Sequence, residues 1–177
     1  MFEFDLFSWH YPLLILAGFI AGFINTMAGG GSLLTLPLLI FMGLPSAVAN
    51  GTNRIAIFMS AFSATAGFKS KGVSNYPFNA YLGFAGLLGA LIGAQIAIDI
   101  EGDLFNKILA VIMIIVVLLI VFKPDIDYKN LSERLTGKYL FISMIAFFFI
   151  GIYGGFINAG IGFVIMLFLH YYNKLDL

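Results

Sequence analysis

The sequence contains no cysteine and few charged residues. Charged side chains make up only 10% of its 177 residues, whereas 61% are hydrophobic. The missing cysteines exclude disulfide bonds and thiolate-bound metal sites. A soluble domain carries about a quarter charged residues, so this composition indicates that lipid surrounds most of the chain. Because nine basic and nine acidic residues cancel, the net charge gives no indication of a nucleic-acid partner.

Three long runs lack any charged side chain: residues 6–53, 72–98 and 139–173. A membrane-spanning helix needs roughly 20 apolar residues, so each run is long enough for at least one crossing. An isolated strand cannot satisfy its backbone in hydrocarbon, and the sequence shows no alternating barrel pattern. We therefore predict an all-α, polytopic integral membrane protein with five to six apolar helical segments, broken at glycine clusters, within a lipid bilayer.

Apolar runs and turn residues predict where these segments lie. Ser46 follows Pro45 and is a candidate N-cap for the second segment. Glycine clusters at 28–32 and 160–162 predict interruptions, each followed by a shorter apolar piece. We expect helices over 9–27, 46–68, 80–98 and 104–122, a further helix from residue 139 onwards, and the shorter pieces over 33–43 and 163–172.

A motif in the first segment recurs 133 residues later. Gly18–Asn25 reads Gly-Phe-Ile-Ala-Gly-Phe-Ile-Asn, and Gly151–Asn158 reads Gly-Ile-Tyr-Gly-Gly-Phe-Ile-Asn. Internal repeats with broken helices are typical of secondary transporters. We therefore divide the chain into a first transmembrane repeat (1–122), a linker (123–138) and the start of a second repeat (139–177).

The basic residues indicate how the chain sits in the membrane. They gather in the segments 69–79 and 123–138, which the positive-inside rule places in the cytoplasm, so the acidic turn 99–103 lies outside. The piece 33–43 leaves two alternatives open. If it crosses, the amino terminus lies outside and the two motif copies are inverted; if it re-enters, the terminus lies inside and the copies are parallel.

The segment Ala-Gly-Gly-Gly-Ser at 28–32 is a candidate binding site. Glycine costs about 1 kcal/mol against alanine inside a helix, so we expect an unwound backbone there. Unwinding at membrane depth frees amide and carbonyl groups, and a helix that restarts near Ser32 directs its positive end at an anion. Gly29, Gly30, Gly31 and Ser32 are thus candidate ligands. The alternative is a kink that only relieves packing.

Arg54 lies eight residues into the predicted second segment, about 12 Å along its axis at 1.5 Å per residue. Insertion scales give a cost of about 2.5 to 3.5 kcal/mol for Arg at mid-span, and the apolar runs contain no acidic residue to pair with it. We expect carbonyl groups, Asn or Thr side chains, water or a transported anion as its partners; Thr52 and Asn53 adjoin it. The alternative is that its stem carries the charge to the outer interface.

Uncharged polar residues provide further candidates. Asn25 and Asn158 could coordinate an ion or a substrate oxygen, or could bond one helix to another. Weaker candidates of the same kind are Thr26, Thr35, Ser60 and Gln95. Glycines spaced four apart predict tight helix packing, and three pairs have this spacing: Gly18 with Gly22, Gly89 with Gly93, and Gly151 with Gly155.

Motifs of membrane enzymes and of ATP-driven pumps do not occur in the sequence. The two histidines, His10 and His170, lie near the ends of predicted helices, and there is no His-Glu-x-x-His pattern and no Walker motif. We therefore predict a protein that is not an enzyme and needs no cofactor.

Two stretches of the sequence resemble a known family. Residues 17–37 read Ala-Gly-Phe-Ile-Ala-Gly-Phe-Ile-Asn-Thr-Met-Ala-Gly-Gly-Gly-Ser-Leu-Leu-Thr-Leu-Pro, and residues 49–53 read Ala-Asn-Gly-Thr-Asn. Both are similar to the signature of the sulfite exporter TauE/SafE family. The resemblance implies a bacterial or archaeal inner-membrane permease that moves small sulfur-containing or organic anions, such as sulfite or sulfoacetate, by secondary transport.

The chain differs from that family in two respects. Many members carry Asp where this chain has Asn25, so a carboxylate that could couple transport to protons is missing. Members also usually extend further, so we expect an incomplete second repeat that requires its missing half or a homo-oligomer. The alternatives are a non-transporting membrane subunit, an inactive fragment of a larger permease, or a cation path through Asn25 and Asn158, which Arg54 disfavours.

Overall fold

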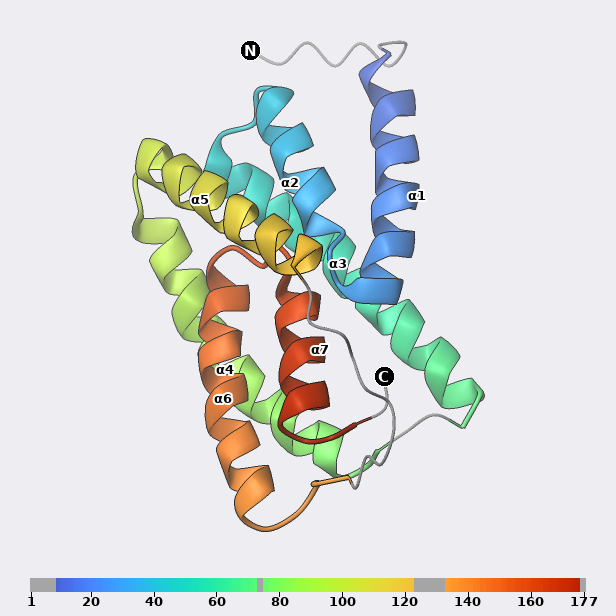
Figure 1. Cartoon of the computed structure of the whole chain (residues 1–177). Helices are drawn as coiled ribbons and strands as arrows, with labels where there is room; N and C mark the ends of the chain where they lie inside the picture. The colour runs from blue at the N-terminus through green and yellow to red at the C-terminus, as the bar shows by residue number, and fades with distance from the viewer. Residues whose placement is uncertain (1–8, 73–74, 123–132, 176–177) are drawn as a thin grey trace.

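The computed structural model describes residues 9–72, 75–122 and 133–175. Over these ranges the chain is entirely helical, as the sequence predicts, with seven helices and no strand (Figure 1). Their bounds are α1 (His10–Ala28), α2 (Ser32–Phe41), α3 (Ser46–Ser70), α4 (Phe78–Asp99), α5 (Gly102–Val121), α6 (Lys138–Phe156) and α7 (Ile161–Tyr171).

Glycine and proline set many of the helix boundaries. Gly29 ends α1 in the left-handed conformation (φ 65°), and Gly160 precedes α7 with φ 71°; glycine adopts this conformation without the steric cost that a Cβ atom brings. Pro45 precedes α3 and occupies its N-cap position. The prediction that Ser46 caps this helix is therefore wrong: Ser46 is the first helical residue, and its hydroxyl donates to Asn106 Oδ1 at 2.7 Å.

The helices form two hairpins that face each other. The α1–α2 hairpin and the α6–α7 hairpin run from opposite ends of the molecule and meet near its middle at their turns (Figure 1). Helix α3 crosses behind the first hairpin, and α4 lies along α6. The two copies of the repeated motif, on α1 and α6, therefore run in opposite directions.

This arrangement bears on the two alternatives that the sequence left open for 33–43. Helix α2 runs back towards the end of the molecule where α1 begins, and the two motif copies are inverted (Figure 1). Inverted copies are what the first alternative predicts, in which 33–43 crosses. The crossing itself and the side of the amino terminus stay predictions.

Glycines hold α4 and α6 together. A Cβ atom added at Gly89 or Gly93 would meet the backbone of α6, and one added at Gly151 or Gly155 would meet the backbone of α4. The predicted packing role of these two pairs is confirmed, because only glycine permits such a close approach of two helices.

The third glycine pair does not follow this prediction. A Cβ atom at Gly18 or Gly22 would meet nothing within 4 Å among the described residues. Close packing against a described helix therefore does not explain this pair.

The interior of the molecule lies around the second hairpin's turn. Ile157 and Ala159 are fully buried there against Leu36 of α2, Ala49 of α3 and Phe105 of α5. By length and composition α4, α5 and α6 can each cross a bilayer, and the apolar stretches Tyr11–Met27, Ser32–Phe41 and Ile161–Tyr171 are shorter. Large apolar side chains such as Phe58, Phe84 and Phe141 are exposed, as expected of helices that face lipid.

The predicted division of the chain at 122 and 138 stays a prediction. Helix α5 ends at Val121 and α6 begins at Lys138. Most of the predicted linker, residues 123–132, lies outside the described residues, as do residues 73 and 74 of the basic segment 69–79.

Candidate functional site

The first break in the helices is formed by Gly29, Gly30 and Gly31 between α1 and α2. The amide of Gly29 donates to Asn25 O at 2.8 Å and closes α1. Helix α2 then starts at Ser32, which is 1% exposed. The next amides of α2 already donate to the carbonyl oxygens of Gly30 and Gly31, so the start of α2 presents chiefly the positive end of the helix dipole at this point. The predicted interruption at 28–32 is therefore present, one residue shorter at each end.

The second break lies between α6 and α7, at residues 157–160. Asn158 takes φ 63°, a left-handed conformation that asparagine tolerates better than most residues. The hydroxyl of Tyr153 donates to the carbonyl oxygen of Ala159, and this bond holds the turn against the preceding helix. The sequence predicted this break at residues 160–162. In the structure it falls at 157–160, and Gly162 lies within α7.

The two breaks touch each other. The amide of Gly162 donates to Gly29 O at 3.4 Å, and a Cβ atom at Gly29 would meet the Gly162 backbone. Gly30 packs against the ring of Phe163. Residues 133 positions apart in the chain thus form a single junction of two interrupted helices near the middle of the molecule (Figure 1).

Side chains of helix α3 bond to the end of α6. The guanidinium of Arg54 donates to the carbonyl oxygens of Gly155 and Phe156, the latter at 3.1 Å. The Asn50 side chain donates to Phe156 O at 2.9 Å. The last carbonyl groups of a helix lack partners and carry partial negative charge, so a cation is well placed there. These carbonyl partners are among those that the sequence predicts for Arg54.

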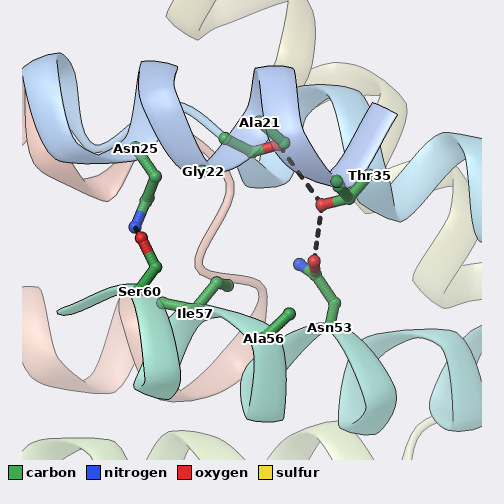
Figure 2. Close-up of a pocket in the computed structure, with 10 residues that line it drawn as sticks. Ala21, Gly22, Asn25, Thr35, Asn53, Ala56, Ile57 and Ser60 are labelled. Atoms are coloured by element: carbon green, nitrogen blue, oxygen red, sulfur yellow. Dashed lines mark hydrogen bonds between the residues drawn. The ribbon is translucent and has the colours of Figure 1, made fainter. Parts of the chain in front are cut away.

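A small cavity lies between α1, α2 and α3. Its volume is about 60 Å³, whereas a single water molecule needs about 10 to 15 Å³ on the same measure, so it has room for one small polyatomic ion. Asn25 donates to Ser60 Oγ at 3.4 Å on one side, and Thr35 donates to Asn53 Oδ1 on the other (Figure 2). The lining residues are Gly18, Ala21, Gly22, Asn25, Gly31, Thr35, Asn53, Ala56, Ile57 and Ser60.

Asn53 brings an unused donor into this cavity. Its side chain extends from α3 towards α1 and α2, with the amide nitrogen on the side that faces Asn25 and Ser60 (Figure 2). The residue is only 2% exposed, and its Nδ2 has no hydrogen-bond partner in the structure. Since leaving a buried donor unpaired costs about 1 to 3 kcal/mol, this nitrogen marks a position where an acceptor would bind favourably.

The ten predicted site residues fall into groups in the structure. Asn25, Gly31 and Asn53 line the cavity. Gly29 and Gly30 contact the second hairpin instead. These five residues thus surround the first break, as the sequence predicts for the glycines.

The remaining five predicted residues lie around and beyond that break. Ser32 is buried at the start of α2, and Asn158 is part of the second break. Arg54 is not among the residues that line the cavity, because its head lies at the end of α6. Thr26 donates to Gly22 O on its own helix, and Thr52 is exposed on α3.

Several residues that line the cavity were weak candidates, or no candidates, from the sequence alone. Thr35 and Ser60 were only weaker candidates, and Ala56 was not considered. Ala56 and Ser60 are spaced four apart on the same face of α3 as Asn53, so a polar and small stripe on this helix was the available signal. Metal binding finds no support among the described residues, which contain no group of three His, Asp or Glu side chains near one another.

The inverted hairpins, the paired breaks and the apolar helices define a multi-pass membrane protein. The family model described as "Sulfite exporter TauE/SafE" matches residues 14–177. The chain therefore belongs to the sulfite exporter TauE/SafE family. No solved structure matches it.

Curated relatives have similar sequences over most of this chain. A "Probable membrane transporter protein" of Haemophilus influenzae is 32% identical over 155 residues, which are 88% of this chain and 60% of that protein. The "Probable membrane transporter protein ORF9" of Sinorhizobium sp is 30% identical over 163 residues, 92% of this chain and 62% of that protein. The chain thus spans about three fifths of the length of these relatives.

Proposed function

We propose that this chain acts in secondary transport of small anions, of the sulfite, sulfonate or small organic acid type, across the inner (cytoplasmic) membrane. The observation that carries the proposal is the unpartnered Asn53 Nδ2 in the cavity beside the first break. A buried N–H group without an acceptor favours a ligand that brings acceptor atoms.

The surroundings of this amide suit a negative ligand. The residues that line the cavity include no Asp or Glu, so no carboxylate repels an anion there. The start of α2 adds the positive end of a helix dipole at Gly31. The names of the relatives and of the family support transport as the function. Proton coupling, a homo-oligomer and the cytoplasmic position of segments 69–79 and 123–138 stay predictions.

Electrical measurement on reconstituted protein tests this proposal. The chain in liposomes on a solid-supported membrane should give saturable currents with at least one anion from a panel of sulfite, sulfoacetate, acetate and chloride. Asn53→Leu should abolish the current. Thr65→Val, at an exposed position of the same helix α3, should leave it unchanged.

Two results would contradict the proposal. Currents that are the same in Asn53→Leu as in the natural chain would remove the amide from the site. A well-inserted chain that gives no current with any anion of the panel would favour the alternative of a non-transporting membrane subunit or an inactive part of a larger permease.

A further inference from the structure

A groove runs along α1 and α3 beside the cavity. The groove is lined by Phe19, Phe23 and Thr26 of α1 and by Met59, Ser63 and Ala64 of α3, and its remaining lining residues, Gly18, Gly22 and Ser60, also line the cavity. The two hollows therefore adjoin at these three residues. Phe19 and Phe23 are 78% and 66% exposed, so the groove lies at the surface whereas Asn53 lies inside.

The shared glycines differ from the other glycine pairs of the chain. At Gly18 and Gly22 an added Cβ atom would meet no described residue within 4 Å, whereas at Gly89 and Gly151 it would meet the backbone of a neighbouring helix. Glycine lowers helix stability by about 1 kcal/mol against alanine, and close helix packing does not offset that cost at Gly18 and Gly22. What these two glycines provide is free space between the groove and the cavity.

The inner end of this free space carries an independent sign of a ligand. The Asn53 amide nitrogen is buried, points towards the cavity and has no partner within the described part of the chain (Figure 2). Ser60 stands where groove and cavity join, and its Oγ accepts from Asn25 at 3.4 Å, which leaves its own hydrogen free to donate. A small ligand that moved inwards would thus pass from one hydroxyl donor to one amide donor.

We propose that the groove between α1 and α3 is the path by which a small anion reaches Asn53, and that Gly18 and Gly22 keep this path open. This inference rests on the proposed function, because it takes the anion in the groove to be the transported anion. It assigns to the two glycines a role in access that is separate from binding.

Cysteine labelling tests the path, because the chain has no cysteine of its own. Asn53→Cys should react with the negatively charged reagent 2-sulfonatoethyl methanethiosulfonate. The reaction should be lost when Gly22→Leu is added, since the larger side chain fills the passage. It should be retained when Gly83→Leu is added instead, because Gly83 lies on α4, is exposed and has equally open space around it.

Several outcomes would overturn the path. Equal labelling in the two double variants would show that access does not pass Gly22, and no labelling of Asn53→Cys alone would show that the reagent does not reach the cavity. Gly18→Leu serves as a second blocking variant if Gly22→Leu does not fold, which size-exclusion chromatography in detergent reveals. Labelling needs no transport, so the expected pattern in a chain without anion currents would retain the path and reject the proposed function.

Discussion

The guanidinium of Arg54 donates to the carbonyl oxygen of Phe156 at 3.1 Å and thereby connects α3 with the end of α6. Gly155 accepts from the same guanidinium, and Asn50 adds a further bond to Phe156. Positive charge at the end of a helix is favourable because the unpaired carbonyl groups there are partially negative. The half-buried cation of Arg54 thus has partners in the protein itself.

Arg54→Leu should lower the stability of the folded chain and reduce anion currents. Hydrogen bonds to charged groups each contribute about 1.5 to 3 kcal/mol, and this variant leaves the carbonyl groups of Gly155 and Phe156 without their cationic donor. Arg54→Lys should restore part of the stability, because it keeps the charge but not the two-pronged geometry. Unfolding in detergent, followed by circular dichroism, measures the loss.

Lys107→Met is the control for the Arg54 variants, because Lys107 is exposed near the start of α5. It should unfold like the natural chain. A stability of Arg54→Leu equal to that of Lys107→Met would mean that the contacts with α6 contribute nothing.

Gly89→Ala should destabilise the pairing of α4 with α6. The added methyl group would meet the backbone of Phe148 and Ile152, and overpacking of this kind typically costs about 1 to 3 kcal/mol. Gly83→Ala on the same helix has open space and should be neutral or stabilising, by up to about 1 kcal/mol, through helix propensity. Denaturant unfolding of both variants measures the difference, and equal stabilities would speak against close packing.

Asn173 and Ser143 should show energetic coupling. Asn173 is fully buried, donates to Ser143 Oγ and to Arg134 O, both at 2.9 Å, and accepts from Ser143 at 3.1 Å. Removing either side chain takes one partner from the other, although Asn173 keeps Arg134 O and Ser143 keeps Tyr139 O. An unpaired buried group costs about 1 to 3 kcal/mol. The double variant Asn173→Ala with Ser143→Ala should therefore cost less than the sum of the single variants.

A double-mutant cycle in detergent measures this coupling. Additive losses would contradict it and would mean that the two side chains act independently at the end of α7.

Asn25→Asp should make anion currents depend on pH. Asn25 lines the cavity and does not titrate, whereas an aspartate there carries negative charge when it is ionised. Ionised aspartate repels an anion, so the current of the variant should rise as the pH falls and protonation removes the charge. The natural chain is the control. Parallel pH profiles of the two proteins would show that position 25 does not face the transported ion.

The helices were predictable because apolar runs and glycines determine them locally. Gly29 ends α1 and Pro45 precedes α3 through backbone restrictions that act within a few residues. Ser46 was misassigned because its hydroxyl bonds Asn106, 60 positions further on. Such a contact depends on how α3 and α5 pack, and no local pattern contains it.

The sequence predicted several residues of the site, but it did not predict which of them lie close together. The sequence marked Asn53 and Arg54 as adjacent candidates on one helix. In the structure the two side chains serve different places, because adjacent helical residues point about 100° apart. Asn53 lines the cavity at the first break, and Arg54 reaches the second. The direction of α6 relative to α1, which decides this division, is a tertiary property.

The contact between Gly29 and Gly162 has a consequence for the variation that this chain can accept. A side chain at Gly29 would meet the Gly162 backbone, so the space at one turn is limited by the opposite turn. A mutational scan should accordingly find position 29 intolerant of every larger residue, unless a compensating shift of the opposite turn restores the fit.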